Sequence, residues 1–363
     1  METTNQQSII KKKNVVIAGP CSAESEEQLI TTATELAQYG KVDVLRAGIW
    51  KPRTNPGGFE GIGTKGLPWL LKAKQLTGLK TAVEVATPKH VEDALSFEVD
   101  VLWIGARTAV NPFSVQQIAD ALKGTKQTVL IKNPINPDLK LWMGAVERIA
   151  TAGIDDIGLI HRGFSSYGNT EYRNVPLWQI PIEMKRLLPD LPVICDPSHI
   201  CGNRTKLHAV AQKSVDLDFD GLIIESHYNP EIALTDKSQQ VTPANLASLL
   251  GKLIYKRQDS DDAAFLQQLE NLREQINHLD EELLTVIGNR MAIAREIGEI
   301  KQRNSVTVLQ SNRYNEILNR VIQKGEENGL SERFVKTYIE AIHIESIRIQ
   351  NEHQNRLSQQ SEA

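Results

Sequence analysis

Cysteine is scarce in this sequence. The 363 residues include only Cys21, Cys195 and Cys201. A small, odd set of cysteines argues against a disulfide framework and is typical of proteins in a reducing compartment. We therefore expect a cytoplasmic protein without structural disulfides, in which Cys195 and Cys201 are core residues.

Long apolar runs and an excess of positive charge are also missing. No run approaches the ~18 apolar residues that a membrane-spanning helix needs, and the polar residues 1–13 are not followed by the apolar core of a signal peptide. The net charge of −4 lacks the basic excess typical of nucleic-acid-binding chains. These absences predict a soluble globular protein with neither membrane nor nucleic acid as a partner.

The glycine-rich fingerprint of dinucleotide-binding folds is absent as well, because Gly19-Pro20-Cys21 after the first apolar run lacks its spacing. What the first 255 residues do contain is eight short β-rich runs that alternate with helical stretches, which is typical of a parallel sheet covered by helices. Eight such units in ~250 residues predict an α/β fold of the (β/α)8 barrel type. A doubly wound open sheet is the alternative. The predicted strands are 15–19, 42–49, 81–86, 101–105, 128–132, 158–161, 193–195 and 222–225. The predicted helices are 26–39, 66–77, 88–97, 112–122, 139–152, 176–188, 205–215 and 242–255.

The sequence changes character after Tyr255. Residues 256–263 are polar and charged and predict a linker between a barrel domain, 1–255, and an all-helical domain, 264–363. Apolar residues recur there at helical spacing, first over ~38 residues that would extend ~57 Å, then over 312–324 and 331–357. A helix of that length is too long for one small bundle, so we expect it to pack along a second chain. The first strand begins about 14 residues into the sequence, so we expect no regulatory domain ahead of the barrel.

Chemically active residues stand at the end of nearly every predicted strand. The carboxyl ends of barrel strands form the functional face of this fold. The segment 46–54 follows the second strand and concentrates cations, which suits an anionic ligand because arginine pairs with phosphate or carboxylate. The residues at these strand ends are Cys21, Arg46, Lys51, Glu84, Arg107, Lys132, Arg162, His199 and Glu225, with Asp236 just beyond.

These residues separate into two groups by their chemistry. One thiol, one imidazole and two carboxylates suit a divalent transition metal such as Mn, Fe, Co or Zn, and the set is Cys21, His199, Glu225 and Asp236. The second group consists of six cations, more than one phosphate needs, which predicts two phosphorylated substrates or one that also carries a carboxylate. The six are Arg46, Lys51, Arg53, Arg107, Lys132 and Arg162.

Seven motifs carry a family resemblance. In order, they are Gly-Pro-Cys-Ser, Lys-Pro-Arg-Thr, Gly-Ala-Arg-Thr, Ile-Lys-Asn, His-Arg-Gly, Asp-Pro-Ser-His and Glu-Ser-His. Over residues 14–255 the chain resembles the short-chain class of 3-deoxy-D-arabino-heptulosonate 7-phosphate (DAHP) synthases. The resemblance implies a metal-dependent condensation of phosphoenolpyruvate with erythrose 4-phosphate. The sister enzyme that makes 3-deoxy-octulosonate 8-phosphate from arabinose 5-phosphate is the closest rival, and Lys-Pro-Arg-Thr favours the erythrose-using family.

The resemblance also implies roles for the strand-end residues. The mixed set of Cys21, His199, Glu225 and Asp236 would bind the metal. Arg107, Lys132 and Arg162 would hold the phosphoenolpyruvate phosphate, with Arg46 and Lys51 near its carboxylate. Arg53 and Thr54 would hold the erythrose phosphate and hydroxyls, and Glu84 would orient a water. Independently of the resemblance, the position of Lys51 among other cations makes it the expected proton donor.

The helical region carries a second set of polar residues. Arg290 and Lys301 are 11 residues apart and share a helix face, whereas Arg273 lies about 100° away from that face and would point elsewhere, for example into the site of a partner chain. Arg313 opens the next helix, and Ser346 and Gln350 stand one turn apart on the last one.

These positions, together with Leu-Arg-Glu-Gln-Ile-Asn-His-Leu-Asp-Glu-Glu-Leu-Leu, are similar over residues 264–353 to the all-helical chorismate mutases. The resemblance implies an intertwined homodimer that converts chorismate to prephenate, with Arg273 completing the partner's site. By the same resemblance, the groups that contact the substrate carboxylates, its ether oxygen and the rest of the pocket are Arg290, Lys301, Arg313, Ser346 and Gln350.

The helical region departs from that family at one point. The family often has an acidic residue after the arginine that corresponds to Arg313, where it contacts the substrate hydroxyl. This sequence has Tyr314 there, and Gln310 three residues before the arginine, so the group that contacts the hydroxyl stays open. We expect a bifunctional shikimate-pathway enzyme whose barrel is feedback-inhibited by prephenate or chorismate through the mutase domain. In the alternative, the helical domain serves only for dimerisation and regulatory ligand binding.

Overall fold

The structure is a computed structural model that describes residues 8–51, 57–168, 170–257 and 259–361. The chain divides into two compact units, residues 1–258 and 259–363. Within the described part of the chain, no helix combines the length and apolar character needed to cross a bilayer. The expected cytoplasmic location stays a prediction.

The first unit is built on eight parallel strands that close into a barrel in sequence order, with β1 paired to both β2 and β8. This closure confirms the predicted (β/α)8 fold and excludes the open sheet. The strands are β1 (Val15–Gly19), β2 (Val44–Arg46), β3 (Lys80–Val85), β4 (Val101–Ile104), β5 (Thr128–Lys132), β6 (Ile157–His161), β7 (Val193–Cys195) and β8 (Gly221–Glu225).

The barrel strands are mostly apolar because both of their faces are buried, and several polar residues stand at their carboxyl ends. One set of side chains, including Ile17, Ala82 and Leu130, fills the barrel interior, and Ile10 from the short segment before β1 joins it. The alternate set, including Val16 and Val83, packs against the surrounding helices in a larger cluster. The strand ends are thereby held in fixed positions around one rim, which is what a precise site requires.

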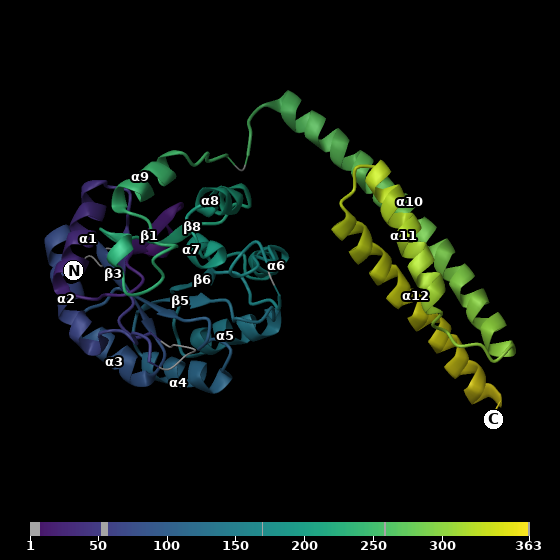
Figure 1. The fold of residues 1–363 in the computed structure, drawn as a ribbon, viewed down its shortest axis with the longest axis horizontal. Coiled ribbons are helices and arrows are strands. Elements are labelled where there is room, and N and C mark those ends of the chain that lie inside the picture. The colour runs from purple at the N-terminus through teal and green to yellow at the C-terminus, as the bar shows by residue number, and fades with distance from the viewer. Residues whose placement is uncertain (1–7, 52–56, 169, 258, 362–363) are drawn as a thin grey trace. The chain divides into compact units, whose positions relative to one another are not determined.

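A ring of helices surrounds the strands (Figure 1). Several helices start with a capping residue followed by proline, as in Thr87-Pro88, Asn111-Pro112 and Thr242-Pro243, because the cap accepts orphan amides and proline needs no partner there. The helices are α1 (Glu26–Gln38), α2 (Leu67–Thr77), α3 (Pro88–Ser96), α4 (Pro112–Leu122), α5 (Leu139–Thr151), α6 (Gln179–Leu187), α7 (Pro197–Cys201), α8 (Leu207–Asp216) and α9 (Pro243–Gly251). Short 3-10 segments are η1 (Ile9–Lys11), η2 (Gly63–Gly66) and η3 (Pro230–Ile232).

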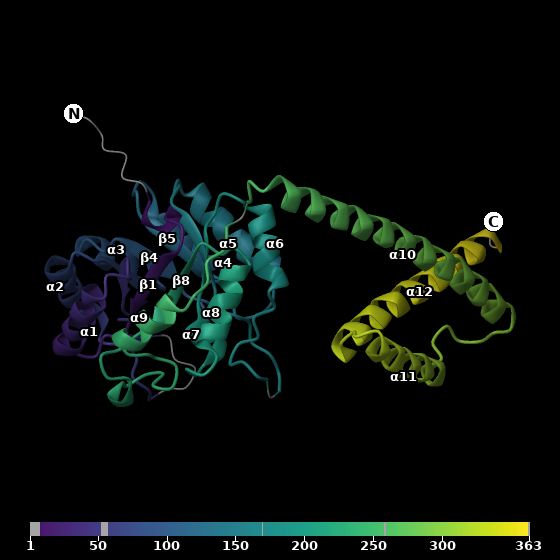
Figure 2. The ribbon, with the colours of Figure 1, turned by 90° about the horizontal axis from the view of Figure 1, so that it is seen from above.

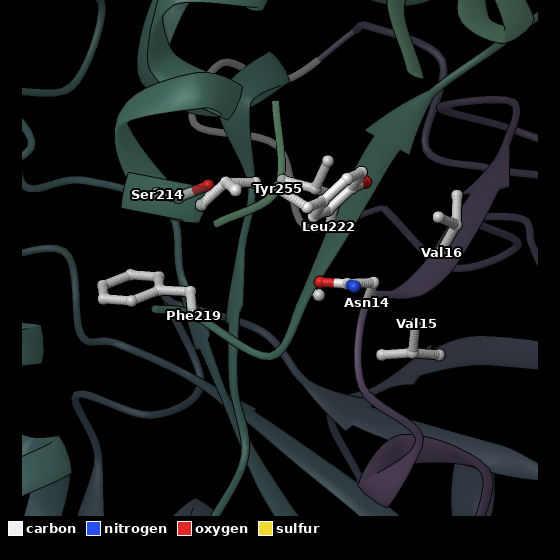
Figure 3. Close-up of a pocket in the computed structure, with 9 residues that line it drawn as sticks. Asn14, Val15, Val16, Ser214, Phe219, Leu222 and Tyr255 are labelled. Carbon is white, nitrogen blue, oxygen red and sulfur yellow. The ribbon is translucent and has the colours of Figure 1, made fainter. Parts of the chain in front are cut away.

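The end of the first unit packs beneath the barrel. Figure 3 shows Tyr255 beside Leu222 and Asn14, near the starts of β1 and β8, around a cavity of about 10 Å³. That volume has room for at most one water molecule, so this cavity is too small to bind a ligand. Gln212 on α8 exchanges two hydrogen bonds with the backbone of Ile254 and fixes this segment.

The second unit is entirely helical in its described residues, as expected. It contains α10 (Ala263–Arg303), α11 (Ser311–Glu327) and α12 (Glu332–Ser361). α12 packs along α10, and α11 packs against α12 (Figure 2). The contact with α10 involves its C-terminal part, where Met291, Ala294 and Gly298 are buried. At 41 residues α10 is slightly longer than predicted, because Asp262 caps its first turn.

The first half of α10 contacts little of its own unit. Leu272, Ile276 and Leu279 are 50%, 57% and 60% exposed. A stripe of large apolar side chains at helical spacing normally faces a core, and the described residues of this chain do not cover it.

Candidate active sites

The carboxyl ends of the barrel strands bring the predicted metal ligands together. Ligand atoms of Cys21, Glu225 and Asp236 all lie within 4.8 Å of one another, and Cys21 Sγ lies 3.3 Å from Asp236 Oδ2. His199 on α7 lies beside them, with Nε2 3.7 Å from Glu225 Oε1. Cys21 precedes the other three residues by 178 to 215 positions in the sequence, and closure of β8 against β1 brings it beside them.

The donor set fits a divalent cation. Glu225 is fully buried, and its Oε1 accepts no hydrogen bond although Arg46 Nη1 lies 3.3 Å away. A buried carboxylate oxygen without a hydrogen bond is free to serve as a metal ligand. Burial opposes ionisation of Glu225, but His199, Arg46 and Lys51 hold its pKa below the usual value. Burial lowers the pKa of His199. Near neutral pH the site therefore offers an anionic carboxylate and a neutral imidazole.

The thiol of the set is protonated in the metal-free protein. Burial, followed by the charge of Glu225, raises the pKa of Cys21 to about 12, while Lys51 acts in the opposite direction. Lys51 Nζ lies 3.1 Å from the sulfur. A divalent ion that binds the sulfur displaces this proton, because a coordinating thiol is deprotonated.

A buried aspartate that the sequence analysis did not single out supports His199. Asp196 caps α7 through the His199 backbone amide, and its Oδ2 lies 2.8 Å from His199 Nδ1. The same Oδ2 accepts a 2.9 Å hydrogen bond from Lys132. Burial opposes its ionisation, yet His199 and Lys132 keep its pKa well below the usual range. This carboxylate orients the imidazole, as the outer partners of metal-binding histidines do, and joins it to a cation of the second group.

Two further residues support the carboxylates, and neither was predicted. Gln239 is fully buried and donates to Glu225 Oε2 at 2.7 Å. Arg173 donates to Gln239 at 2.7 Å and to Asp236 at 3.0 Å. Arg173 thereby contacts one carboxylate directly and reaches the other through Gln239. A basic residue in the loop after β6 was the available signal, but its spacing from Asp236 gave no hint of the contact.

The predicted cations occupy the same rim. Arg46 is buried, with Nη2 bonded to the Cys21 carbonyl at 3.2 Å and Nη1 3.3 Å from Glu225 Oε1. Arg162 donates to Asn174 at 2.7 Å, and burial lowers its pKa to about 10 while Asp196 acts in the opposite direction. Arg107 follows β4 and is exposed. Two of the predicted residues, Arg53 and Thr54, lie outside the described residues.

Glu84 at the end of β3 stands among these cations. Its Oε2 accepts a 3.0 Å hydrogen bond from the indole of Trp103 on β4, and a Cβ atom at Gly105 would lie 2.1 Å from its Oε1. The carboxylate therefore has a fixed place on the rim, which depends on a glycine at position 105.

The helical unit has a separate pocket of about 440 Å³ between its three helices. It is lined by the predicted residues Arg290, Lys301, Arg313, Ser346 and Gln350. Arg290 donates to Ser346 at 2.7 Å, and Lys301 donates to the Val308 carbonyl at 2.6 Å. The buried Gln350 Oε1 has no hydrogen-bond partner. Two guanidinium groups and an ammonium group in one pocket suit a dianionic ligand.

Arg273 does not line this pocket. Its side chain is 62% exposed and lies 3.6 Å from Glu270 on the same helix. The prediction that it serves a partner's site is compatible with this placement but stays a prediction.

Three pocket residues occupy the region where the family's acidic residue was missing. Gln310, Tyr314 and His343 all line the cavity, and the rings of Tyr314 and His343 lie 4.3 Å apart. Burial lowers the pKa of His343, and Arg290 and Lys301 lower it further. His343 was not predicted, and it brings a neutral imidazole to the pocket near pH 7. Glu316 pairs with Arg313 at 3.0 Å and does not line the cavity.

Comparison with known families gives two matches in one chain. Residues 2–259 match the DAHP synthetase I family, and residues 272–351 match chorismate mutase type II. These matches confirm the two resemblances drawn from the motifs and show that the chain combines a DAHP synthetase I domain with a chorismate mutase type II domain. The exact domain boundaries remain predictions.

Individual relatives support the first match. A phospho-2-dehydro-3-deoxyheptonate aldolase from Thermotoga maritima is 33% identical over 226 residues, which cover 62% of this chain and 64% of that protein. The chain thus spans less than two thirds of that relative. A 2-dehydro-3-deoxyphosphooctonate aldolase from Trichlorobacter lovleyi is 27% identical over 258 residues, which cover 66% and 90% of the two chains.

A solved structure agrees with the fold. The crystal structure of the DAHP synthase from Thermotoga maritima matches with a TM-score of 0.60 and 30% identity, and the match covers 66% of this chain and 67% of that one. A truncated form of the Thermotoga maritima enzyme matches with a TM-score of 0.57 and 28% identity over 66% and 84% of the two chains.

Proposed function

We propose, since this chain belongs to the DAHP synthetase I family and also carries a chorismate mutase type II domain, that it is a bifunctional enzyme of the shikimate pathway. The barrel condenses phosphoenolpyruvate with erythrose 4-phosphate to give DAHP and phosphate. The helical unit rearranges chorismate to prephenate. The observation that carries the first activity is the position of a metal-ligand set beside a group of buried cations on one barrel rim.

The metal would be held by Cys21, His199, Glu225 and Asp236, for which Mn, Fe, Co and Zn are the candidates. When bound, a divalent ion at this position acts as a Lewis acid on the aldehyde oxygen of erythrose 4-phosphate. Asp196 and Gln239 keep the imidazole and the Glu225 carboxylate in place.

The cations would hold phosphoenolpyruvate. Arg107, Lys132 and Arg162 bind its phosphate, and Arg46 and Lys51 lie near its carboxylate. Because Lys132 and Arg162 are already held by Asp196 and Asn174, they need little reorganisation when charge develops. Arg53 and Thr54 are assigned to the erythrose phosphate and hydroxyls by family resemblance alone.

The condensation forms one carbon–carbon bond and releases phosphate. Carbon 3 of phosphoenolpyruvate attacks the aldehyde carbon, and the new hydroxyl receives a proton from Lys51. Water oriented by Glu84 adds to carbon 2, and inorganic phosphate leaves as the ketone forms. Glu84 is fixed for this role by the Trp103 indole.

The test of this activity is the loss of phosphoenolpyruvate absorbance, with and without a chelator. Erythrose 4-phosphate should support turnover, and arabinose 5-phosphate should not. Preference for arabinose 5-phosphate would identify the octulosonate enzyme, the name carried by the Trichlorobacter lovleyi relative. Chelator-insensitive turnover would refute the metal assignment.

For the mutase, we propose that Arg290, Lys301 and Arg313 bind the two carboxylates and the ether oxygen of chorismate, with Ser346 and Gln350 completing the pocket. A cation at the ether oxygen stabilises charge that develops as the bond breaks. The exposed apolar stripe on α10 supports a homodimer in which the partner's Arg273 enters this pocket.

The second candidate is a helical unit that binds product but does not catalyse. Cations already grouped around a cavity favour catalysis, because simple retention of a product does not require one of them at the ether oxygen. A mutase assay on the full chain separates the two readings. Tight prephenate binding without turnover would favour the regulatory one.

The most specific part of the proposal is feedback inhibition of the barrel by the ligand of the helical unit. Prephenate or chorismate held by Arg290, Lys301 and Arg313 would inhibit condensation, with a coupling of ~1–3 kcal/mol. Prephenate titrated against condensation should inhibit the wild type but not Arg290→Ala. Equal inhibition of both would place the effector site elsewhere.

A further inference from the structure

Trp103 lies directly under the cations of the barrel site. Its side chain is completely buried and belongs to the cluster that fills the barrel interior, together with Ala82 and Leu130 from the neighbouring strands. The other members of that cluster have aliphatic side chains, whereas the indole of Trp103 also meets charged groups that the proposed reaction uses.

Two cations stand over the indole. Arg46 Cζ lies 5.0 Å from the ring centroid, and Lys132 Nζ lies 5.9 Å from it. They come from β2 and β5, on either side of β3 and β4. An aromatic face within about 6 Å of a cation attracts it electrostatically, and most strongly when water is excluded. Here Arg46 and Lys132 are 1% and 4% exposed, so the contact takes place in such a setting.

The edge of the same indole fixes an anion. Nε1 donates to Glu84 Oε2 at 3.0 Å. Gly105 follows Trp103 by two residues, and the absence of a side chain there leaves the space that Glu84 Oε1 occupies. The segment Trp103-Ile104-Gly105 therefore supplies both the donor and the room for this carboxylate.

A second tryptophan shows what a purely structural indole looks like in this barrel. Trp142 on α5 is equally buried and also makes one indole hydrogen bond, 3.2 Å to the Ile131 carbonyl. It packs in the layer between the sheet and the helices, and its indole N–H is bonded to a backbone carbonyl and not to a charged group. Trp103 and Trp142 are thus matched in burial and in hydrogen bonding but differ in contact with the site.

We infer that Trp103 is a positioning residue for phosphoenolpyruvate: its face holds Arg46 and Lys132 and its edge holds Glu84, so that the anion site is preformed. This inference rests on the proposed condensation. Face and edge have separable effects. The face acts on substrate binding through the two cations. The edge acts on turnover through the carboxylate that orients the attacking water.

Substitutions can separate face from edge. Trp103→Phe keeps an aromatic face and removes the N–H group, whereas Trp103→Leu removes both. The full-length protein is loaded with one divalent metal, and phosphoenolpyruvate binding is measured by calorimetry without the second substrate. The kcat and KM values for condensation are measured alongside. Trp142→Phe and Trp142→Leu are the matched controls.

We expect Trp103→Leu to bind phosphoenolpyruvate on the order of tenfold more weakly, since two desolvated cation contacts are lost. Trp103→Phe should restore most of that affinity and KM, while its kcat stays reduced by about tenfold because a hydrogen bond to a charged group is missing. The Trp142 variants should match the wild type in both quantities. If Trp103→Leu does not fold, a lowered kcat at unchanged KM in Trp103→Phe, but not in Trp142→Phe, still supports the inference.

Other outcomes would overturn the inference that Trp103 is a positioning residue. Wild-type binding and kcat in the Trp103 variants, or equal losses in the Trp142 variants, would show that the indole only fills space. A wild-type protein that neither binds phosphoenolpyruvate nor consumes it with erythrose 4-phosphate would refute the proposed function, and this inference with it.

Discussion

The two units of this chain differ in how far each one covers its own apolar surface. The barrel buries large side chains on both faces of its sheet. In the helical unit only a few apolar residues are buried, among them Met291, Val335 and Ile342. Most of the exposed large apolar side chains among the described residues belong to this smaller unit. The barrel covers its own apolar faces, whereas the described residues of this chain leave much of the apolar surface of the helical unit exposed.

The two sites differ in the same way. On the barrel rim, polar side chains hold one another, as in the Arg173–Gln239–Glu225 and Lys132–Asp196–His199 connections. The helical pocket is a cavity of about 440 Å³, and Arg273 of the same chain does not line it. This difference supports the proposal that a partner chain completes the second site, whereas the first is held by residues of its own chain.

The largest expected effect separates the two activities. Cys21→Ala should lower condensation by about 10³-fold or more, because several kcal/mol of transition-state stabilisation depend on the metal. Mutase turnover should stay within a few-fold of wild type. Both activities are assayed on one preparation, with Cys195→Ala as the control at another buried cysteine. Full condensation activity in Cys21→Ala would exclude the thiol as a ligand.

The converse change is expected in the helical pocket. Arg290→Ala should lower mutase turnover by about 10²–10³-fold, with condensation unchanged. The dimer should survive, because a cation that faces a cavity contributes little to association. Arg295→Ala is the control, since Arg295 lies on the same helix, is exposed and does not line the cavity. Dissociation of Arg290→Ala in sedimentation experiments would mean that Arg290 is structural.

A smaller effect tests the bracing of the barrel site. Gln239→Leu removes the amide that joins Arg173 to Glu225, and it should weaken metal binding by about 10–100-fold. Competition between the metal-free protein and a chromogenic chelator measures this without any assay of activity. Gln212→Leu, at the barrel's surface, controls for the substitution itself. An unchanged metal affinity in Gln239→Leu would show that the hydrogen bond from Gln239 is not needed to position Glu225.

The last prediction concerns acid stability, not activity. Burial, followed by the charge of Arg162, lowers the pKa of His161 to about 3, whereas an unfolded histidine titrates near 6.5. The unfolded state therefore binds the proton first, and the barrel should lose up to about 1.4 kcal/mol per pH unit as pH falls below about 6.5. The loss ends near pH 3, where the folded state also binds the proton.

Tryptophan fluorescence can follow this loss in the barrel alone, because all five tryptophans precede residue 255. In urea titrations at pH 7 and pH 5, His161→Phe should flatten the dependence of the barrel transition on pH. His208→Asn, an exposed histidine on α8, should leave it intact. If the barrel transition depends on pH equally in the wild type and in His161→Phe, groups other than His161 cause the loss of stability in acid.

The sequence predicted the barrel and its rim residues because both leave local signals. Apolar runs mark strands buried on two faces, and polar residues such as Lys132 and Glu225 stand where those runs end. It also predicted the long helix of the second unit from its apolar spacing. The supporting residues were missed because their partners are far away in the sequence. Asp196 is 64 residues from Lys132 and Arg173 is 63 from Asp236, and only the closed barrel brings each pair together.

Trp103 was missed for a related reason. A tryptophan within an apolar run is indistinguishable from ordinary core until the strand register shows which way it faces. The short helix α7 was not predicted either, since five residues are too few for a periodic pattern, although the Asp196-Pro197 start is a recognisable cap.

The central claim is that one site is complete in a single chain and the other is shared by two. It is tested most directly by mixing chains that carry Arg273→Ala with chains that carry Arg290→Ala, after each is shown to lack mutase activity. If Arg273 acts in the partner's pocket, random exchange in a symmetric dimer restores about a quarter of wild-type mutase activity, while condensation stays at its full value throughout. Mutase activity that stays absent after verified subunit exchange would show that both residues serve the same chain's pocket and would contradict the account.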